Sequence, residues 1–160
     1  MATRSRLAVA VAAIMGLALV AASALATPSS GIRAERLGSV LNDTKVNHNS
    51  AGIQVKTAKP FEVFTQKVTF SPGGTSGWHS HPGVSFVSVI AGTLALYDDK
   101  CARKTYAAGS GFSDYNRKVH VARNEGSNDA VVLVTYVRPA PTQRLPNFID
   151  EPAPAGCAVR

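Results

Sequence analysis

The sequence contains few charged and few aromatic residues. Asp, Glu, Lys and Arg make up 17% of its 160 residues, and Phe, Trp and Tyr make up 7%, whereas 45% are hydrophobic. A low charged fraction with an ordinary apolar fraction excludes a wholly disordered chain and a charged coiled coil. The sequence also lacks a repeat of fixed period, which argues against a solenoid or a propeller. The length suits one domain with a compact core.

Several catalytic motifs are absent as well. The sequence has no Gly-x-Ser-x-Gly elbow, no glycine-rich phosphate loop and no Cys-x-x-Cys pair, so hydrolase, kinase and disulfide-exchange functions lack their residues. Acidic residues are few, 10 against 17 basic ones, for a net charge of +7. The basic residues are scattered, which favours a solvated basic surface over nucleic-acid binding. We therefore expect no nucleic-acid partner.

One long apolar run is present, and it lies at the start of the chain. A basic segment (residues 1–6) precedes an apolar stretch (residues 7–22) and the small-residue step Ala24-Leu25-Ala26. This order predicts a secretory signal peptide over residues 1–26, cut after Ala26. An uncut signal anchor is the alternative, because the run could nearly span a bilayer, but the small-residue end favours cleavage. We expect a secreted, periplasmic or cell-envelope protein with no membrane contact after cleavage.

The two cysteines lie far apart in the sequence. Cys101 is in a polar turn, and Cys157 is near the end of a proline-rich tail over residues 139–160. In an exported chain such a pair predicts a disulfide, with two free thiols as the alternative. The prolines prevent the tail from forming a regular ladder, so the bridge would tether it to the domain. By restricting the unfolded chain, a disulfide that closes so long a loop stabilises the folded state by roughly 4 kcal/mol.

Short segments rich in Val, Thr and Phe follow one another from residue 53 onward, each ended by Gly, Pro, Asn or Asp. This pattern predicts an all-β fold, an antiparallel β-barrel or two-sheet sandwich, with the barrel over residues 53–138. The predicted strands are 52–57, 61–70, 77–81, 85–90, 93–97, 105–107, 118–123 and 130–137. The predicted core includes Phe86, Leu94, Leu96, Phe112, Val119, Val132, Val134 and Tyr136. Residues 27–52 form an N-terminal extension, in which 31–41 fit either a short helix or an opening strand.

Three of the four histidines occupy predicted strands. His79 and His81 are two residues apart, so their side chains leave a strand on the same side. A third imidazole, His120 on another strand, would complete a set of the kind that binds a divalent metal. The alternative is a surface or hydrogen-bonded histidine cluster without a metal. His48 lies in a polar stretch and has no assigned role.

The residues around these histidines resemble the two sequence motifs of the cupin family. The first motif is a glycine, His-x-His, a glutamate and a second glycine, and the matching residues are Gly73, His79, His81, Ser85 and Gly92. The second motif is a glycine, Pro-x-Gly, a histidine and an asparagine, and the matching residues are Gly109, Tyr115, Arg117, His120 and Asn124. The resemblance spans about residues 61–137. Serine replaces the glutamate, and tyrosine and arginine replace the proline and glycine of a turn.

The resemblance implies a cupin β-barrel, or jelly roll, with a metal at its mouth. The implied ligands are His79, His81 and His120, and the implied cofactor is one divalent transition metal ion, Fe, Mn, Cu, Ni or Zn. Ser85, Asn124 and Tyr115 are candidates for residues beside the ligands or in the pocket. A small-molecule ligand is the expected partner, and a homodimer is open because cupins often pair their barrels.

The missing glutamate bears on the function. The Ser85 hydroxyl is a poor ligand and no base at neutral pH, so three neutral imidazoles would leave the metal charge uncompensated and coordination positions open. Asp114 is a candidate substitute. This arrangement favours a dioxygenase-like enzyme on a small carbonyl or organic-acid substrate over oxalate-type decarboxylation. A non-catalytic module that binds a metal or small ligand, and a metal-free structural barrel, are the two alternatives.

Overall fold

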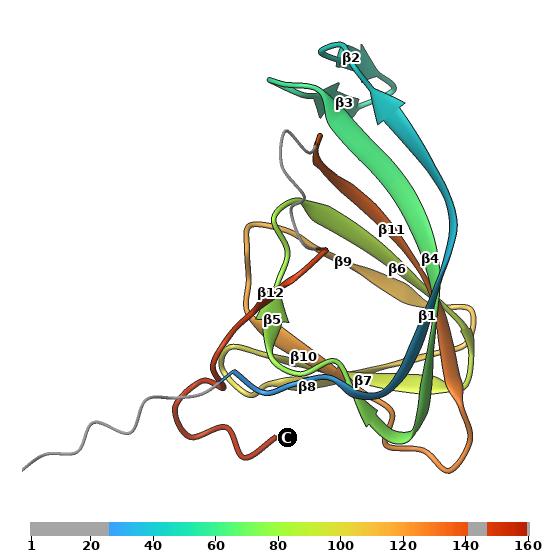
Figure 1. Cartoon of the computed structure of the whole chain (residues 1–160), viewed down its shortest axis with the longest axis vertical. Coiled ribbons are helices and arrows are strands. Elements are labelled where there is room, and N and C mark those ends of the chain that lie inside the picture. The colour runs from blue at the N-terminus through green and yellow to red at the C-terminus, as the bar shows by residue number, and fades with distance from the viewer. Residues whose placement is uncertain (1–25, 141–146, 160) are drawn as a thin grey trace, which may run out of the picture.

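The computed structural model describes residues 26–140 and 147–159. The predicted signal peptide, except Ala26, lies outside these residues. The described residues form strands and turns, with no helix among them, which confirms the all-β expectation (Figure 1). Among the described residues, no helix could therefore span a membrane.

Twelve strands are assigned in the described residues. They are β1 (Ser30–Asn42), β2 (Asn47–Ser50), β3 (Ile53–Lys56), β4 (Phe61–Thr75), β5 (His79–Ser80), β6 (Val84–Ala91), β7 (Thr93–Asp98), β8 (Arg103–Ala107), β9 (Gly111–Asp114), β10 (His120–Arg123), β11 (Ala130–Pro139) and β12 (Ile149–Asp150).

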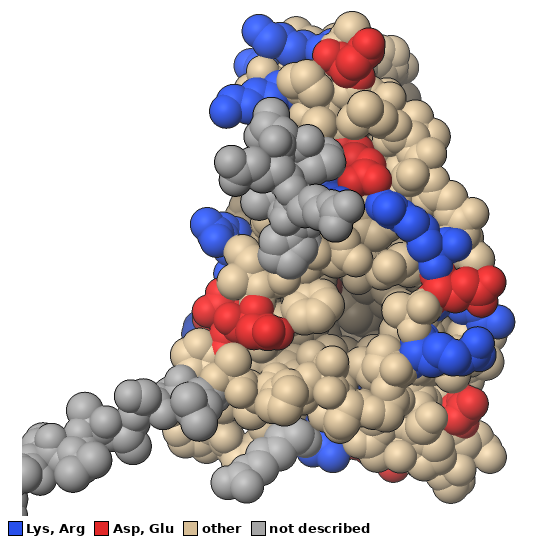
Figure 2. All heavy atoms as spheres, viewed as in Figure 1, with Lys and Arg blue, Asp and Glu red and all other residues tan. Residues whose placement is uncertain are grey.

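Ten of these strands form one antiparallel sheet that curls into a nearly closed jelly-roll barrel (Figure 1). The sheet runs in the order β12-β5-β10-β4-β11-β6-β9, with β1 beside β4, and with β7 joining β10 to β8. Long β1 and β4 extend beyond the barrel toward the separate β2–β3 hairpin (Figure 1). Seen from the same side, the space-filling surface is hollowed near the middle of the barrel (Figure 2).

Alternating apolar residues give the barrel its interior. Along β11 every second residue from Ala130 to Tyr136 is buried, because successive side chains of a strand point to opposite faces. The buried cluster is Phe64, Val68, Phe70, Val87, Val89, Leu94, Ala122, Ala130, Val132, Val134 and Tyr136. The prediction of Phe86 as core is wrong. It is 53% exposed, because β6 turns Val87 and Val89 inward and therefore Phe86 outward.

Three of the differences from the predicted strands bear on the barrel and the site. Residues 31–41 form a strand, β1, paired with β4 from Asn42↔Phe61 to Ser30↔Thr75, so part of the expected extension belongs to the barrel sheet. The predicted strand 77–81 is reduced to the two residues of β5, since Gly77 has a φ of +67° and Pro82 follows closely. Strand β9 was not predicted, because Gly-Phe-Ser-Asp has little strand propensity of its own.

Candidate metal centre

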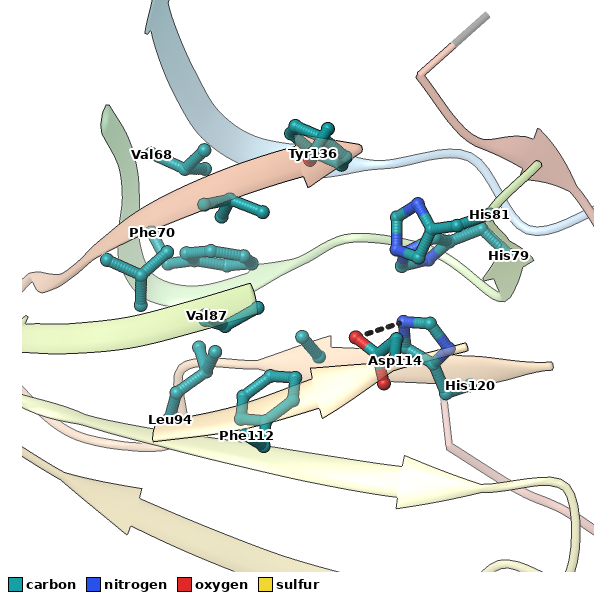
Figure 3. Close-up of a pocket in the computed structure, with 13 residues that line it drawn as sticks. Val68, Phe70, His79, His81, Val87, Leu94, Phe112, Asp114, His120 and Tyr136 are labelled. Carbon is teal, nitrogen blue, oxygen red and sulfur yellow. Dashed lines mark ion pairs between the residues drawn. The ribbon is translucent and has the colours of Figure 1, made fainter. Parts of the chain in front are cut away.

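Strands β5 and β10 bring the three predicted histidines together. His79 and His120 are directly paired across the two strands, and His81 lies just beyond β5. The ring centroids are 4.3 to 5.2 Å apart, and the candidate ligand atoms all lie within 4.8 Å of one another. All three residues are buried, with 7, 6 and 5% of the surface of His79, His81 and His120 exposed. Figure 3 shows His120 facing His79 and His81 from the opposite side of the pocket.

A backbone carbonyl orients each imidazole. The Nδ1 atoms of His79, His81 and His120 lie 2.9, 3.0 and 3.0 Å from the carbonyl oxygens of Gly77, Asn147 and Lys118. A carbonyl oxygen can only accept a hydrogen bond, so each Nδ1 carries the proton and donates it. Each Nε2 is then left with a lone pair. A histidine held in this way is in the tautomer that binds a metal ion through Nε2.

Burial favours the neutral form of His79 and His81. Burial, together with repulsion from the neighbouring imidazoles of His120 and His81, lowers the pKa of His79 to about 3. Burial also lowers the pKa of His81 below its ordinary value, although the hydrogen bond to Asn147 opposes this. A neutral imidazole is the form that donates an electron pair to a metal, so no proton need be displaced from these two ligands at neutral pH.

A carboxylate lies beside the histidines, although the motif glutamate is missing. Asp114 on β9 places Oδ2 3.5 Å from Nε2 of His120, with side chains 13% and 6% exposed (Figure 3). Ser85 on β6 is fully buried and directly paired with Asp114, and its hydroxyl donates a 3.2 Å hydrogen bond to Oδ2. On the other side Ser85 is paired with Tyr136 of β11. Burial, and then the charge of Asp114, raise the pKa of Tyr136 to about 12, so its hydroxyl stays protonated.

An apolar pocket continues from the histidines into the barrel. Its volume is about 70 Å³, and Figure 3 shows the polar side chains gathered at one end of it. A pocket of this volume has room for only a few water molecules or a small ligand. The apolar walls include Val68, Phe70, Val87, Leu94, Phe112 and Val134. Such a site suits a ligand with a polar head and a short apolar end.

Two other predicted residues do not line this pocket. Asn124 is 1% exposed, but its side chain holds a turn: it donates to the carbonyls of Phe70 and Asn128 and accepts from the Gly126 amide. Tyr115 is 46% exposed, lies against Lys118 and is not among the residues that line the pocket. The reason is the turn at Asn116 and Arg117, both in the left-handed region, which directs the chain outward between β9 and β10.

The C-terminal tail supplies residues that the sequence did not indicate. Besides the Asn147 carbonyl on His81, the Phe148 ring lies 5.6 Å from that of His79. Cys101 and Cys157 are joined in a disulfide, as predicted, which ties the tail to the turn between β7 and β8. No motif contains these tail residues. A backbone carbonyl such as that of Asn147 makes its contact whatever the side chain of its residue, so it leaves no signal in the sequence.

The chain was compared with known protein families. Residues 66–136 match the family model described as Cupin domain. The matched segment contains all three histidines, Ser85 and Asp114, and it ends before the tail. No curated protein matches the chain.

Solved structures with the same fold share little sequence with the chain. A Shewanella frigidimarina RmlC-like cupin is 19% identical, over 72% of this chain and 82% of that one, with a TM-score of 0.49. The Cupin_2 domain of an Enterobacter cloacae XRE family transcriptional regulator is 16% identical, over 69% and 99%, with a TM-score of 0.47. A Streptococcus pyogenes protein of unknown function is 19% identical, over 49% and 66%, with a TM-score of 0.44.

Proposed function

Since the chain belongs to the cupin superfamily, with its cupin domain at residues 66–136, we propose that His79, His81 and His120 bind one divalent transition metal ion through Nε2. The observation that carries this proposal is the set of three buried imidazoles whose Nδ1 protons are all given to carbonyl oxygens. The donor set suits Fe, Mn, Cu, Ni or Zn, because imidazole is a ligand of intermediate softness.

Asp114 takes the place of the missing cupin glutamate. Two atoms bound to one metal ion at about 2.1 Å each lie roughly 3 Å apart at a right angle. The 3.5 Å between Asp114 Oδ2 and His120 Nε2 is close to that separation. The carboxylate therefore stands where it can bind the ion or accept a hydrogen bond from a water molecule on it. It brings one negative charge to three neutral imidazoles.

The proposed activity is that of a dioxygenase-like enzyme on a small carbonyl compound or organic acid. When bound, the ion supplies a Lewis acid and, if it is redox-active, an electron donor. The residues of the chain orient the substrate: the apolar walls around Phe112 and Leu94 enclose its short apolar end and exclude water from it. The Asp114 carboxylate is the group placed to accept a proton at the metal side of the pocket, and Ser85 holds it there.

A non-catalytic metal and ligand-binding module is the second candidate. The observation that favours it is that Asp114 already accepts a hydrogen bond from Ser85 and lies against His120. A carboxylate that already accepts a hydrogen bond is less free to take up a proton. In this case the small ligand would bind in step with the metal and be released unchanged.

Export is part of the proposal. The Cys101–Cys157 disulfide fits an extracellular or periplasmic location, where disulfides form and persist. We propose that residues 1–26 are a signal peptide, on the pattern of basic, apolar and small residues. Mass spectrometry of the exported protein tests this directly, with an N-terminus at Thr27 expected.

Elemental analysis of untagged protein tests the metal site. We expect one equivalent of transition metal in the wild type, none in His79→Ala, and one in His48→Ala, because His48 is exposed on β2. An equal metal content in all three would contradict the site. Oxygen uptake by the metal-loaded protein with a panel of small carbonyl compounds and organic acids then tests the enzyme. Binding without turnover would favour the second candidate.

A further inference from the structure

The C-terminal segment 147–159 lies outside the matched cupin domain, yet it contacts two of the three histidines. We propose that this segment contributes to metal binding. Asn147 positions His81, and the Cys101–Cys157 disulfide keeps the segment in place. The inference rests on the proposed metal binding. It predicts that the rate at which the metal leaves depends on a disulfide in the turn between β7 and β8.

The first step of the argument is the position of the Asn147 carbonyl. It accepts the Nδ1 proton of His81, at 3.0 Å. The Asn147 side chain is itself held, since Arg138 donates a 3.1 Å hydrogen bond to its Oδ1. Arg138 is fixed in turn by two hydrogen bonds, of 2.8 and 3.0 Å, to Glu62, which is 8% exposed. The barrel wall thus determines where the carbonyl lies, and the carbonyl determines the tautomer and ring orientation of His81.

The second step is the pairing of the segment with β5. Strand β12 aligns Ile149 with Ser80 and Asp150 with His79 (Figure 1). The Ser80 hydroxyl, which points away from the two ligands, donates a 2.8 Å hydrogen bond to Glu151, and the Glu151 amide donates to the Trp78 carbonyl at 2.9 Å. These contacts hold the backbone between the two ligands His79 and His81. Strand β12 makes them as the neighbour of β5 at the end of the sheet.

The third step is the anchoring of the far end. The Trp78 indole, fully buried, donates a 3.0 Å hydrogen bond to the Val159 carbonyl, and Cys157 is bonded to Cys101. A two-residue strand such as β12 is too short to stay paired by itself and opens locally. The disulfide keeps the opened segment close to β5 and so favours its return. Without the disulfide the segment stays away longer, and His81 loses its carbonyl partner for that time.

Loss of the partner that orients a ligating histidine lowers metal affinity about 10- to 100-fold. We expect loss of the disulfide to produce the lower end of that range, because the carbonyl is displaced for only part of the time. The experiment uses the full exported protein with both cysteines replaced, Cys101→Ser and Cys157→Ser. The protein is loaded with Co²⁺, and the ion is removed by excess chelator while the absorbance of bound Co²⁺ is followed.

The expected result is a rate of Co²⁺ release about tenfold faster in the double variant than in the wild type, with one equivalent bound in both. Glu151→Ala loosens the same segment without touching the disulfide and is expected to speed release several-fold. Glu35→Ala, an exposed acid on β1, is the matched control and should release Co²⁺ at the wild-type rate. Circular dichroism of each metal-free variant verifies that the barrel is folded.

The outcomes separate this inference from the proposed function. If the wild type binds no metal, the proposed function fails, and the inference fails with it. If the wild type binds one equivalent but both tail variants release it at the wild-type rate, the inference is overturned and the proposed function stands. Should the double variant not fold, the Glu151→Ala rate alone decides between the two results.

Discussion

Ser85 and Asp114 face each other across β6 and β9, and the serine hydroxyl donates a hydrogen bond to the aspartate carboxylate. Ser85 stands where the first cupin motif has its glutamate. Asp114, on the neighbouring strand, places a carboxylate beside His120 at the same end of the pocket (Figure 3).

The first prediction concerns this carboxylate. Asp114→Asn should lower the affinity for a divalent metal by roughly tenfold, because it removes the negative charge beside three neutral imidazoles. Isothermal titration with Zn²⁺ measures the change. A matched variant moves the charge back: Ser85→Glu combined with Asp114→Ser should recover most of the lost affinity. Unchanged affinity in Asp114→Asn would show that the carboxylate takes no part in metal binding.

The second prediction separates the turn role of Asn124 from a role in the site. Asn124→Ala removes three hydrogen bonds and leaves the Phe70 carbonyl without its side-chain donor. We expect a loss of about 2 to 3 kcal/mol in the free energy of unfolding. The number of metal ions bound at saturation should not change. Urea denaturation and elemental analysis measure the two quantities, and a stable variant with less metal would reverse the assignment.

The third prediction concerns Arg117, which replaces the glycine of the second motif. Its φ is +53°, in the left-handed region where a side chain costs about 1 to 2 kcal/mol. Arg117→Gly should therefore stabilise the protein by about 1 kcal/mol, after allowance for the greater freedom of glycine in the unfolded chain. Lys56→Gly, in strand β3, is the control and should destabilise it. A lower melting temperature for Arg117→Gly would contradict the conformational argument.

The fourth prediction is a pH dependence at the surface. Glu125 accepts hydrogen bonds from Tyr97 and from Arg103, and these, Tyr97 first, lower the pKa of its carboxyl below the ordinary value. A carboxyl whose pKa is lowered in the folded state stabilises that state fully above the unfolded-state pKa, which is about 4.3 for glutamate. This contribution is lost as the pH falls through the folded-state pKa.

Glu125→Gln should accordingly melt about 1 to 2 °C below the wild type at pH 7, a small difference because the cluster is exposed. Below pH 4 the two melting curves should converge. Calorimetric scans at both pH values make the comparison. A difference that persists unchanged in acid would mean that Glu125 acts through packing and not through its charge.

Much of the site could be predicted because the chemistry depends on residue type and spacing. Two histidines in alternation on a strand, with a third in a second motif, indicated a common metal site before any fold was known. The position of Tyr115 next to a turn with positive φ angles at Asn116 and Arg117 could not be predicted, because no strand pattern reveals such angles. The side of the sheet that Asp114 faces was equally undetermined, since β9 was not recognised as a strand.

The all-β class, the resemblance to the cupin motifs, the three histidines and the cysteine pair could be read from the chain, because periodicity, turn residues and motif spacing are local properties. That Asp114 lies beside the histidines, and that Asn147, Phe148 and Glu151 contact β5 and its neighbour His81, became evident only from the fold. These contacts join strands distant in sequence, or use backbone carbonyls that every residue possesses. Their positions follow from how the sheet closes.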